Sequence, residues 1–350
     1  MKSTARQLQQ PVEVVCREHA IALLGDCSTE VGRLGSAADT EALHDFRVSV
    51  RRLRTYLGAY QSYLPKAVAG KARRQLGDLI SVTNHGRDDQ VQSRWLDSQL
   101  ARKNLPLLMR KGFTQVAATF ESVPFDSETE ELVALKAEYT GIEKRLGDRL
   151  GEPLRTIKLT EHGDSLRFAG ATGQIIRDLT AKLGSRLGAI ESLNQAKRIH
   201  RTRLTAKRMR YVLEPVRMLV VGGRTVIRQL KGLQDVLGDI RDLQLLEQRV
   251  RSSLKQGAAD WSRAIVEAAT TESTLAAIMR KGGKTDDIRG MAAALFGVRQ
   301  AETRLFKRLQ TQWLGGNSEP FMLQVDKITL QLLPTEALSR KRTEGSREST

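Results

Sequence analysis

The chain has 350 residues, enough for about two domains of ordinary size or for one domain built by internal duplication. Its 57 Lys and Arg outnumber its 40 Asp and Glu, and the formal net charge of +17 indicates a polyanionic partner. Only 5% of the residues are aromatic, and helix-forming residue types dominate the rest, which argues against an all-β fold or a doubly wound sheet. We therefore expect an all-α protein.

Cysteine usage and hydropathy limit the compartment. The two cysteines, Cys16 and Cys27, are too few for a disulfide framework or a four-thiolate zinc site, and we expect both to be small buried residues of one helix. No segment has the roughly 18 apolar residues of a membrane span, and residues 1–11 lack the apolar stretch of a secretory signal. We expect a cytoplasmic protein.

Helical periodicity begins after Pro11 and returns in long blocks joined by short loops. The breaks fall at residues 32–39, 63–70, 84–87, 124–127, 151–153, 222–223, 282–286 and 315–320. Residues 151–164 are the least helical stretch and lie near the midpoint, so we expect a first half at residues 1–152 and a second at 153–335. Residues 336–350 have little apolar content, and we expect a disordered basic tail there.

An internal repeat links the two halves. Residues 44–54, HDFRVSVRRLR, match residues 200–210, HRTRLTAKRMR, without a gap and at an offset of 156 residues. The shared pattern is H-x-x-R-[VL]-x-x-[RK]-R-[LM]-R, and each copy contains one of the five histidines. We interpret the halves as an internally duplicated pair of helical bundles.

The repeated segment is amphipathic. At about 100° per residue, one face of each copy is cationic, with His44, Arg47, Arg51 and Arg54 in the first and His200, Arg203, Lys207 and Arg210 in the second. Apolar side chains gather on the opposite faces: Phe46, Val50, Leu53, Leu57 and Tyr60, and Met209, Leu213 and Val216. Two such helices facing each other would line a basic groove.

Four aligned cations need a compensating partner, because like charges one turn apart destabilise a helix by a few tenths of a kcal/mol per pair. Arginine forks suit phosphate oxygens, and a spacing of about 5 Å along the helix suits a linear phosphate polymer. The alternatives are a solvated helix face, or arginines paired with Asp and Glu of neighbouring helices.

A third segment carries a related pattern. Residues 224–244 place Arg224, Arg228 and Lys231 on a stripe that continues into Asp235 and Asp242. We expect these aspartates to orient arginines of the neighbouring repeat helix while the cations reach the ligand. In the first half Lys71, Arg74 and Asp78 begin a similar but less regular pattern.

The two histidine-led segments, together with LKGLQDVLGDIRD at residues 230–242, resemble the CHAD family, the conserved histidine α-helical domains. The resemblance spans roughly residues 10–320. It implies two four-helix bundles related by a pseudo-twofold axis, a basic central channel, and binding of inorganic polyphosphate, often at polyphosphate granules.

Carried over by position, the signature residues are His44, Arg47, Arg51, Arg52 and Arg54 in the first half, and His200, Arg203, Lys207, Arg208, Arg210 and Tyr211 in the second. The first-half counterpart of the LQDVLGDIRD segment departs from the family pattern, since residues 76–79 reach Arg87 and Asp88 only through a longer, looser path. Contacts from residues 81–88 are therefore in doubt. Many relatives carry a triphosphatase module marked by Glu-x-Glu-x-Lys, which nothing here matches, so we expect a stand-alone binding domain.

Other chemistries find little support. Residues 283–285, Gly-Lys-Thr, resemble the end of a P-loop, but the required first glycine is Ile278 and no strand precedes it. His44 and His200 lack a nearby second histidine or carboxylate at metal-ligand spacing, and no nucleophile elbow or paired acidic cluster is present. We expect no metal, no cofactor and no enzymatic activity. His19, His85 and His162 have no repeated partner and are interpreted as incidental, whereas protonated and neutral roles remain open for His44 and His200.

The leading hypothesis is non-enzymatic binding of long-chain inorganic polyphosphate, with association at polyphosphate granules. The predicted contacts are His44, Arg47, Arg51, Arg52, Arg54, Lys71, Arg74, His200, Arg203, Lys207, Arg208, Arg210, Arg224, Arg228 and Lys231. The alternatives are binding of an RNA or DNA backbone and a granule scaffold that docks an acidic partner. The two basic stripes offer at most Tyr56 and Tyr211 as aromatic side chains on which bases could stack. We also expect Arg47, Arg51, Arg203 and Lys207 to lie off the core face.

Overall fold

The computed structural model describes residues 3–35, 39, 41–82, 85–120, 130–154, 157, 159, 166–271 and 285–333, with the side chains of residues 85–88 left out. Within these residues all regular structure is helical, which confirms the all-α fold class. An isolated β-bridge joins Pro11 and Arg167.

The helices follow the expected blocks. In chain order they are α1 (Ala5–Leu8), α2 (Val12–Arg33), α3 (Ala42–Ala59), the short η1 (Gln61–Tyr63) and η2 (Val68–Ala72), α4 (Arg73–Val82), α5 (His85–Leu100), α6 (Leu107–Ala117), α7 (Glu130–Gly151), α8 (Phe168–Gly188), α9 (Ala196–Leu213), α10 (Gly223–Thr271), α12 (Thr285–Trp313) and α13 (Glu319–Leu332). Three of the expected breaks contain glycines with positive φ, among them Gly35 at 92° after α2, Gly222 at 86° before α10 and Gly316 at 91° after α12, a conformation that glycine adopts without strain.

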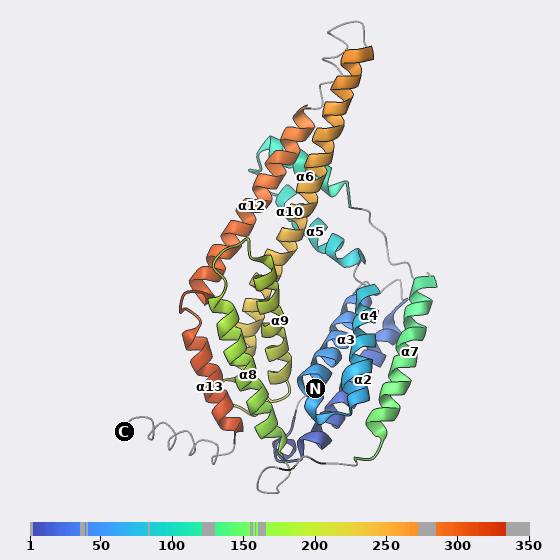
Figure 1. Cartoon of the computed structure of the whole chain (residues 1–350), viewed down its shortest axis with the longest axis vertical. Helices are drawn as coiled ribbons and strands as arrows, with labels where there is room; N and C mark the ends of the chain where they lie inside the picture. The colour runs from blue at the N-terminus through green and yellow to red at the C-terminus, as the bar shows by residue number, and fades with distance from the viewer. Residues whose placement is uncertain are drawn as a thin grey trace.

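One group of helices contains α2, α3, α4 and α7 (Figure 1). The apolar face predicted for α3 is its core face, because Val50, Leu53 and Leu57 are fully buried. The ring of Phe46 meets the ring of Tyr139 on α7 edge to face, with the centroids 5.5 Å apart. Both cysteines are free, buried residues of α2, as expected.

A second group contains α8, α9, α13 and the first part of α10 (Figure 1). Met209 and Leu213 of α9 are fully buried, as the predicted apolar face requires, and so are Leu233 and Leu237 of α10. The cationic sides of α3 and α9 are thus set by the faces that these helices bury.

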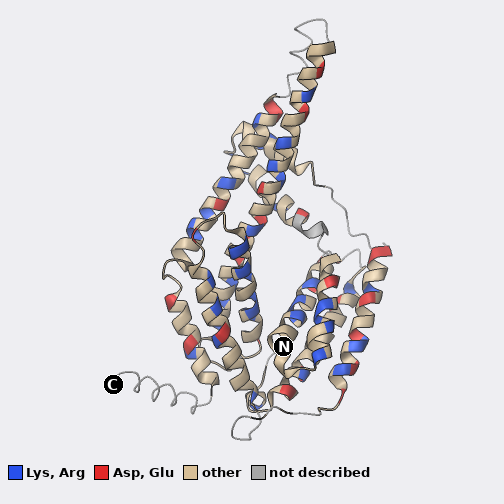
Figure 2. Ribbon diagram, viewed as in Figure 1, with Lys and Arg blue, Asp and Glu red and all other residues tan. Residues whose placement is uncertain are grey.

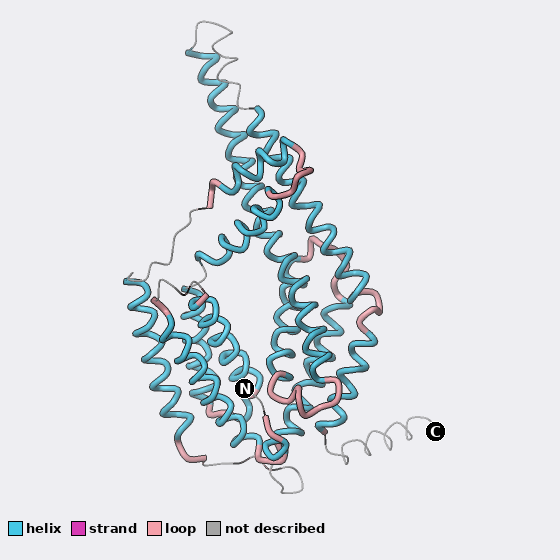
Figure 3. Tube along the Cα trace, turned by 180° about the vertical axis from the view of Figure 1, so that it is seen from behind, coloured by secondary structure: helices cyan, strands magenta, loops and turns pink. Residues whose placement is uncertain are grey.

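Helices α5 and α6 lie against the middle of the 49-residue helix α10 and against α12 (Figures 1 and 3). Here Leu96, Phe113, Leu246 and Val298 form a separate buried cluster. Helices α6 and α12 cross so closely that a Cβ added to Gly112 would overlap the backbone of α12. Residues from the expected first half therefore complete a core with residues from the expected second half. The boundary at residue 152 stays a prediction.

The two groups are joined at the starts of α2 and α8. The amide of Val12 donates to the carbonyl of Leu166, and the amide of Phe168 donates to the carbonyl of Gln10, each at 2.9 Å. Nearby, the hydroxyls of Tyr60, the residue that follows α3, and Thr172 on α8 are hydrogen bonded at 3.0 Å. These contacts fix how α3 is placed relative to the second group.

Candidate functional site

The two histidine helices, α3 and α9, pack against each other where the two helical groups meet. Figure 2 shows Lys and Arg along α3, α4 and α9 on both sides of this division. The structure therefore brings together the two repeated segments, which are far apart in the sequence.

The cationic stripe of α3 is only partly available to a ligand. Arg54 is exposed, and His44, Arg51 and Arg52 are half-buried. Arg47 is only 3% exposed, so the expectation that it lies off the core face is wrong. The reason is that α2 and α4 both pack on α3 and widen its buried arc beyond Phe46 and Val50.

The stripe of α9 is half-buried along its length. Burial, followed by the positive charges of Arg241, Arg203 and Lys207, lowers the pKa of His200 from its usual 6.5. The lowered pKa favours the neutral role over the protonated one. Its buried Nδ1 atom has no hydrogen-bond partner within the described residues.

Helix α10 supports the α9 stripe. The guanidinium group of Arg203 lies across Gly238, where an added Cβ would be 3.3 Å from the arginine Nε. Asp239, which the sequence analysis missed, lies near Arg203: burial and the charges of Asp242 and Asp235 raise its pKa, and Arg308 and Arg203 oppose that rise. The exposed cations expected on this helix are Arg224, Arg228 and Lys231.

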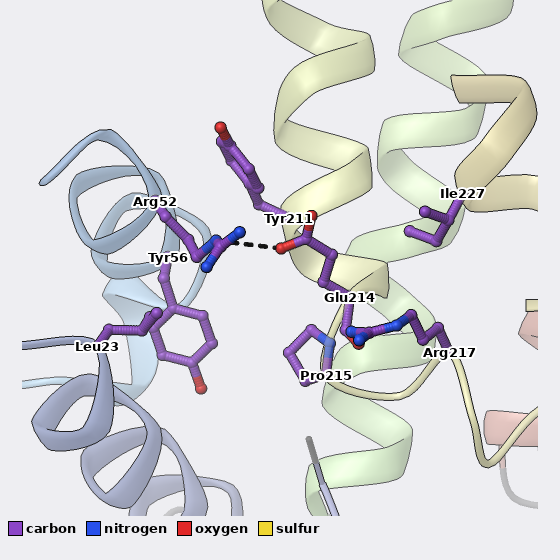
Figure 4. A pocket seen from close by; sticks show the side chains of 8 residues that line it. All are labelled: Leu23, Arg52, Tyr56, Tyr211, Glu214, Pro215, Arg217 and Ile227. Atoms are coloured by element: carbon purple, nitrogen blue, oxygen red, sulfur yellow. Dashed lines mark hydrogen bonds and ion pairs between the residues drawn. The ribbon is translucent and has the colours of Figure 1, made fainter. Parts of the chain in front are cut away.

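A carboxylate joins the two histidine helices. Glu214, the residue that follows α9, has one carboxylate oxygen 3.3 Å from Arg52 Nε and the other 3.6 Å from Arg210 Nη1. Arg52 and Arg210 were both predicted to bind polyphosphate, and for these two the alternative of pairing with a neighbouring acid holds. Figure 4 shows the pocket of about 280 Å³ beside this ion pair, lined by Leu23, Arg52, Tyr56, Tyr211, Glu214, Pro215, Arg217 and Ile227.

The two tyrosines near the stripes are buried. Tyr56 is 1% exposed and Tyr211 is 4% exposed, and the Arg210 guanidinium lies 4.8 Å from the centroid of the Tyr211 ring. Neither ring presents a face on which a base would stack. Tyr56 also contacts His19, with 3.3 Å between its hydroxyl and the imidazole Nδ1, and His19 is a buried residue of the core.

Lys71 belongs to a different surface from the α3 and α9 stripes. It lines a pocket of about 420 Å³ between the start of α4 and α7, together with Arg145 and Arg149. Arg74, three residues further on, is exposed on α4. The structure does not bring Lys71 into the pocket beside Glu214.

The family model described as CHAD domain matches residues 23–251. The chain belongs to the CHAD domain family. The resemblance identified from the histidine helices is thus confirmed.

Solved structures with the same fold include the crystal structure of the CHAD domain from the plant Ricinus communis, with a TM-score of 0.55, 21% identity, and coverage of 86% of this chain and 95% of that chain. PptA from Streptomyces chartreusis is also similar, with a TM-score of 0.47, 14% identity, and coverage of 85% of this chain and 100% of that one. No curated protein matches the sequence. The likeness to the Ricinus communis domain shows the fold alone.

Three arginines of this CHAD domain enter the site without having been singled out from the sequence. The charge of Arg241 acts on His200, and the charges of Arg73 and Arg186 act on Arg208 of α9. Arg73 directly precedes the predicted Arg74, which is a weak signal, whereas Arg186 lies on α8, outside both repeated segments. Only the packing of α4, α8 and α9 reveals these neighbours.

Several predictions concern residues outside the described ranges. The basic tail at 336–350 and the glycine and lysine of the rejected P-loop lie there, as do the side chains of residues 85–88. Among the described residues, no group of three or more His, Cys, Asp or Glu side chains is arranged to hold a metal ion. No helix in that part of the chain has both the length and the apolar character needed to span a bilayer.

Proposed function

We propose that this CHAD domain binds inorganic polyphosphate without catalysing a reaction, and that it associates with polyphosphate granules in the cytoplasm. The observation that supports this most directly is the packing of α3 against α9, which places two cationic segments side by side. The family resemblance implies the same ligand.

The charge balance of the site favours a ligand with many phosphates. Arg54, Arg74 and Arg208 are exposed cations with no ion pair to any described acidic residue, and Arg228 and Lys231 add to them on α10. Arginine donates several hydrogen bonds in one plane, which matches phosphate oxygens at successive positions of a chain. A polyphosphate chain would relieve the mutual repulsion of these cations.

Buried tyrosines distinguish this proposal from nucleic-acid binding. An RNA or DNA backbone would satisfy the same electrostatics. Recognition of single-stranded bases normally adds aromatic stacking, however, and Tyr56 and Tyr211 are both buried. The site therefore suits a chain that has phosphates and no bases.

We further propose that the two halves are related by duplication around a pseudo-twofold axis. The offset of the sequence repeat, 156 residues, relates Val12 to Phe168 and Gln10 to Leu166. The hydrogen bond from Val12 to Leu166 and the one from Phe168 to Gln10 are therefore equivalent bonds made in opposite directions between the halves. The bridge between Pro11 and Arg167 then joins two equivalent positions. Such self-pairing is what a twofold axis produces.

The test is competition at a salt concentration near 0.15 M. Labelled long-chain polyphosphate is displaced by unlabelled polyphosphate, single-stranded RNA or duplex DNA at equal phosphate concentration. We expect polyphosphate to compete at least a hundredfold better, about 2.7 kcal/mol. A salt titration should show a steep loss of affinity, because binding releases counterions.

Two results would contradict the proposal. Equal competition by the nucleic acids would indicate a general polyanion surface. Binding that is insensitive to salt and survives Arg51→Glu and Lys207→Glu would instead favour a scaffold that docks an acidic protein elsewhere.

A further inference from the structure

Helices α3 and α4 hold two arginines in a reciprocal arrangement. A Cβ added to Gly58 of α3 would lie 2.9 Å from Nη1 of Arg73, and one added to Gly77 of α4 would lie 3.1 Å from Nε of Arg54. Each arginine is four residues before the glycine of its own helix, so both helices carry the spacing Arg-x-x-x-Gly. Each guanidinium group thus lies where a larger side chain on the other helix would displace it.

Arg73 and Arg54 are positioned by this close packing and not by carboxylates. Neither has an ion pair within the described part of the chain. They differ in this respect from Arg52 and Arg210, whose charges are offset by Glu214. An arginine that is held in place and keeps an uncompensated charge is prepared to bind an anion.

The second helical group supplies two more such cations. Arg186 of α8 donates from Nη1 to the carbonyl of Arg201 at 2.9 Å and to the hydroxyl of Thr205, so its guanidinium group lies along α9. Arg208 follows Thr205 by three residues and is therefore about one turn further along the same helix. No ion pair to a described acidic residue involves either arginine.

Arg73 of α4 lies on the side of α3 that carries Gly58, and α3 packs against α9. Partial burial of Arg208, and then the charges of Arg73 and Arg186, lower its pKa from the usual value. Guanidinium groups from α4, α8 and α9 therefore share one local environment, and the described structure provides no carboxylate to neutralise them. Bringing three such charges together is unfavourable unless an anion joins them.

We propose that Arg73, Arg186 and Arg208 form one phosphate-binding subsite shared by the two helical groups, with Gly58 as the positioning residue that keeps Arg73 in it. The inference rests on the proposed function and names where a single phosphate of the chain is held. A phosphate at this point is contacted from both groups, so the subsite couples them.

Arginine removal tests the shared subsite. Long-chain polyphosphate binding is measured at about 0.15 M salt for wild type, Arg73→Ala, Arg208→Ala and the double variant. Arg145→Ala, which removes an exposed arginine from α7 on the far side of the first group, is the matched control. We expect each single variant to weaken binding about tenfold. The double variant should fall well short of the hundredfold loss that independent contacts predict, because either change breaks the same contact.

Replacement of the glycine tests the positioning role. Gly58→Leu should weaken binding about as much as Arg73→Ala, and should add nothing in the Arg73→Ala background. Gly25→Leu is the control, because Gly25 is an exposed glycine of α2 with no neighbour within 4 Å of an added Cβ. Circular dichroism confirms that each variant is folded.

The outcomes separate the two proposals. If wild type and Arg145→Ala bind polyphosphate equally well but Arg73→Ala and Arg208→Ala also bind like wild type, the subsite is wrong and the proposed function stands. Independent losses in the double variant would place the two arginines on different phosphates and overturn the shared subsite. If wild type does not bind polyphosphate, the proposed function itself fails.

Discussion

The histidine helices α3 and α9 carry the same eleven-residue pattern, yet their cations lie in different surroundings. Arg47 of α3 is buried, whereas Arg203, at the equivalent place in α9, is half-buried across Gly238. Arg54 is exposed and its guanidinium group lies against Gly77, whereas its counterpart Arg210 forms an ion pair with Glu214. Equivalent positions in a repeat therefore need not make equivalent contacts.

The difference arises from what packs on each helix. Helix α3 is covered by α2 and α4, and Glu214 has no acidic counterpart in the first copy, where the position 156 residues earlier is Gly58. The pattern specifies which side of a helix is cationic. The neighbouring helices decide which of those cations remain available.

The largest expected effect concerns the buried apolar face that each histidine helix has. Leu53→Asp should prevent stable folding, because it buries an unpaired carboxylate in place of a fully buried side chain, at a cost of more than about 4 kcal/mol. Leu204→Asp on α9, where the leucine is exposed, should change little. Thermal melting followed by circular dichroism measures both, and an unchanged melting temperature for Leu53→Asp would show that the core face of α3 is misassigned.

Arginine truncation sharpens the contrast between the copies. Arg47→Ala should lower the free energy of unfolding by roughly 2 to 3 kcal/mol, because it removes a buried stem and charge. Arg203→Ala should lower it by less than about 1 kcal/mol. Urea unfolding of the two variants gives the comparison directly. Equal losses would mean that the two environments are energetically the same despite their geometry.

Acid should weaken the first group through His19. Burial lowers the pKa of His19 to about 4, below its usual 6.5, so the unfolded chain binds the proton more readily. Stability present at neutral pH is therefore lost as the pH falls below about 6.5, by about 2 kcal/mol between pH 7 and pH 5. Urea unfolding at the two pH values measures this loss, and His19→Gln should remove that part of it. The same pH dependence in the variant would assign it to other groups.

The smallest expected effect is at the ion pair between the copies. Glu214→Gln removes the negative charge beside Arg52 and Arg210, and should tighten polyphosphate binding about fivefold, or ~1 kcal/mol. Glu191→Gln, at an exposed carboxylate 3.8 Å from Arg198, is the control and should have less effect. Weaker binding by Glu214→Gln would show that the carboxylate is needed to position the arginines for the ligand.

Much of the fold follows from the sequence because local patterns suffice for it. The apolar spacing of Val50, Leu53 and Met209 predicts which faces are buried, and glycines mark the breaks at Gly222 and Gly316. The histidine pattern leads to the family. The packing of α5 and α6 on α10 and α12 could not be predicted in this way, because it depends on contacts between segments more than a hundred residues apart.

The candidate site shows the same division. The repeated pattern points to Arg208, and the structure places it at a cluster of cations. Arg186 carries no pattern, and Arg73 enters only because Gly58 leaves room for it. Burial of Arg47 depends on how far α2 and α4 cover α3, which a helical wheel does not contain.

The shared core of α5, α6, α10 and α12 has a consequence for synthesis. Leu96 and Phe113 leave the ribosome long before Val298, which covers them in the finished fold. During that interval their apolar side chains have no permanent cover, and the nascent chain exposes them to chaperones and to other chains. The last long helix to be made thus completes the tertiary structure of the first third of the polypeptide, and folding cannot proceed simply from the amino end to the carboxyl end.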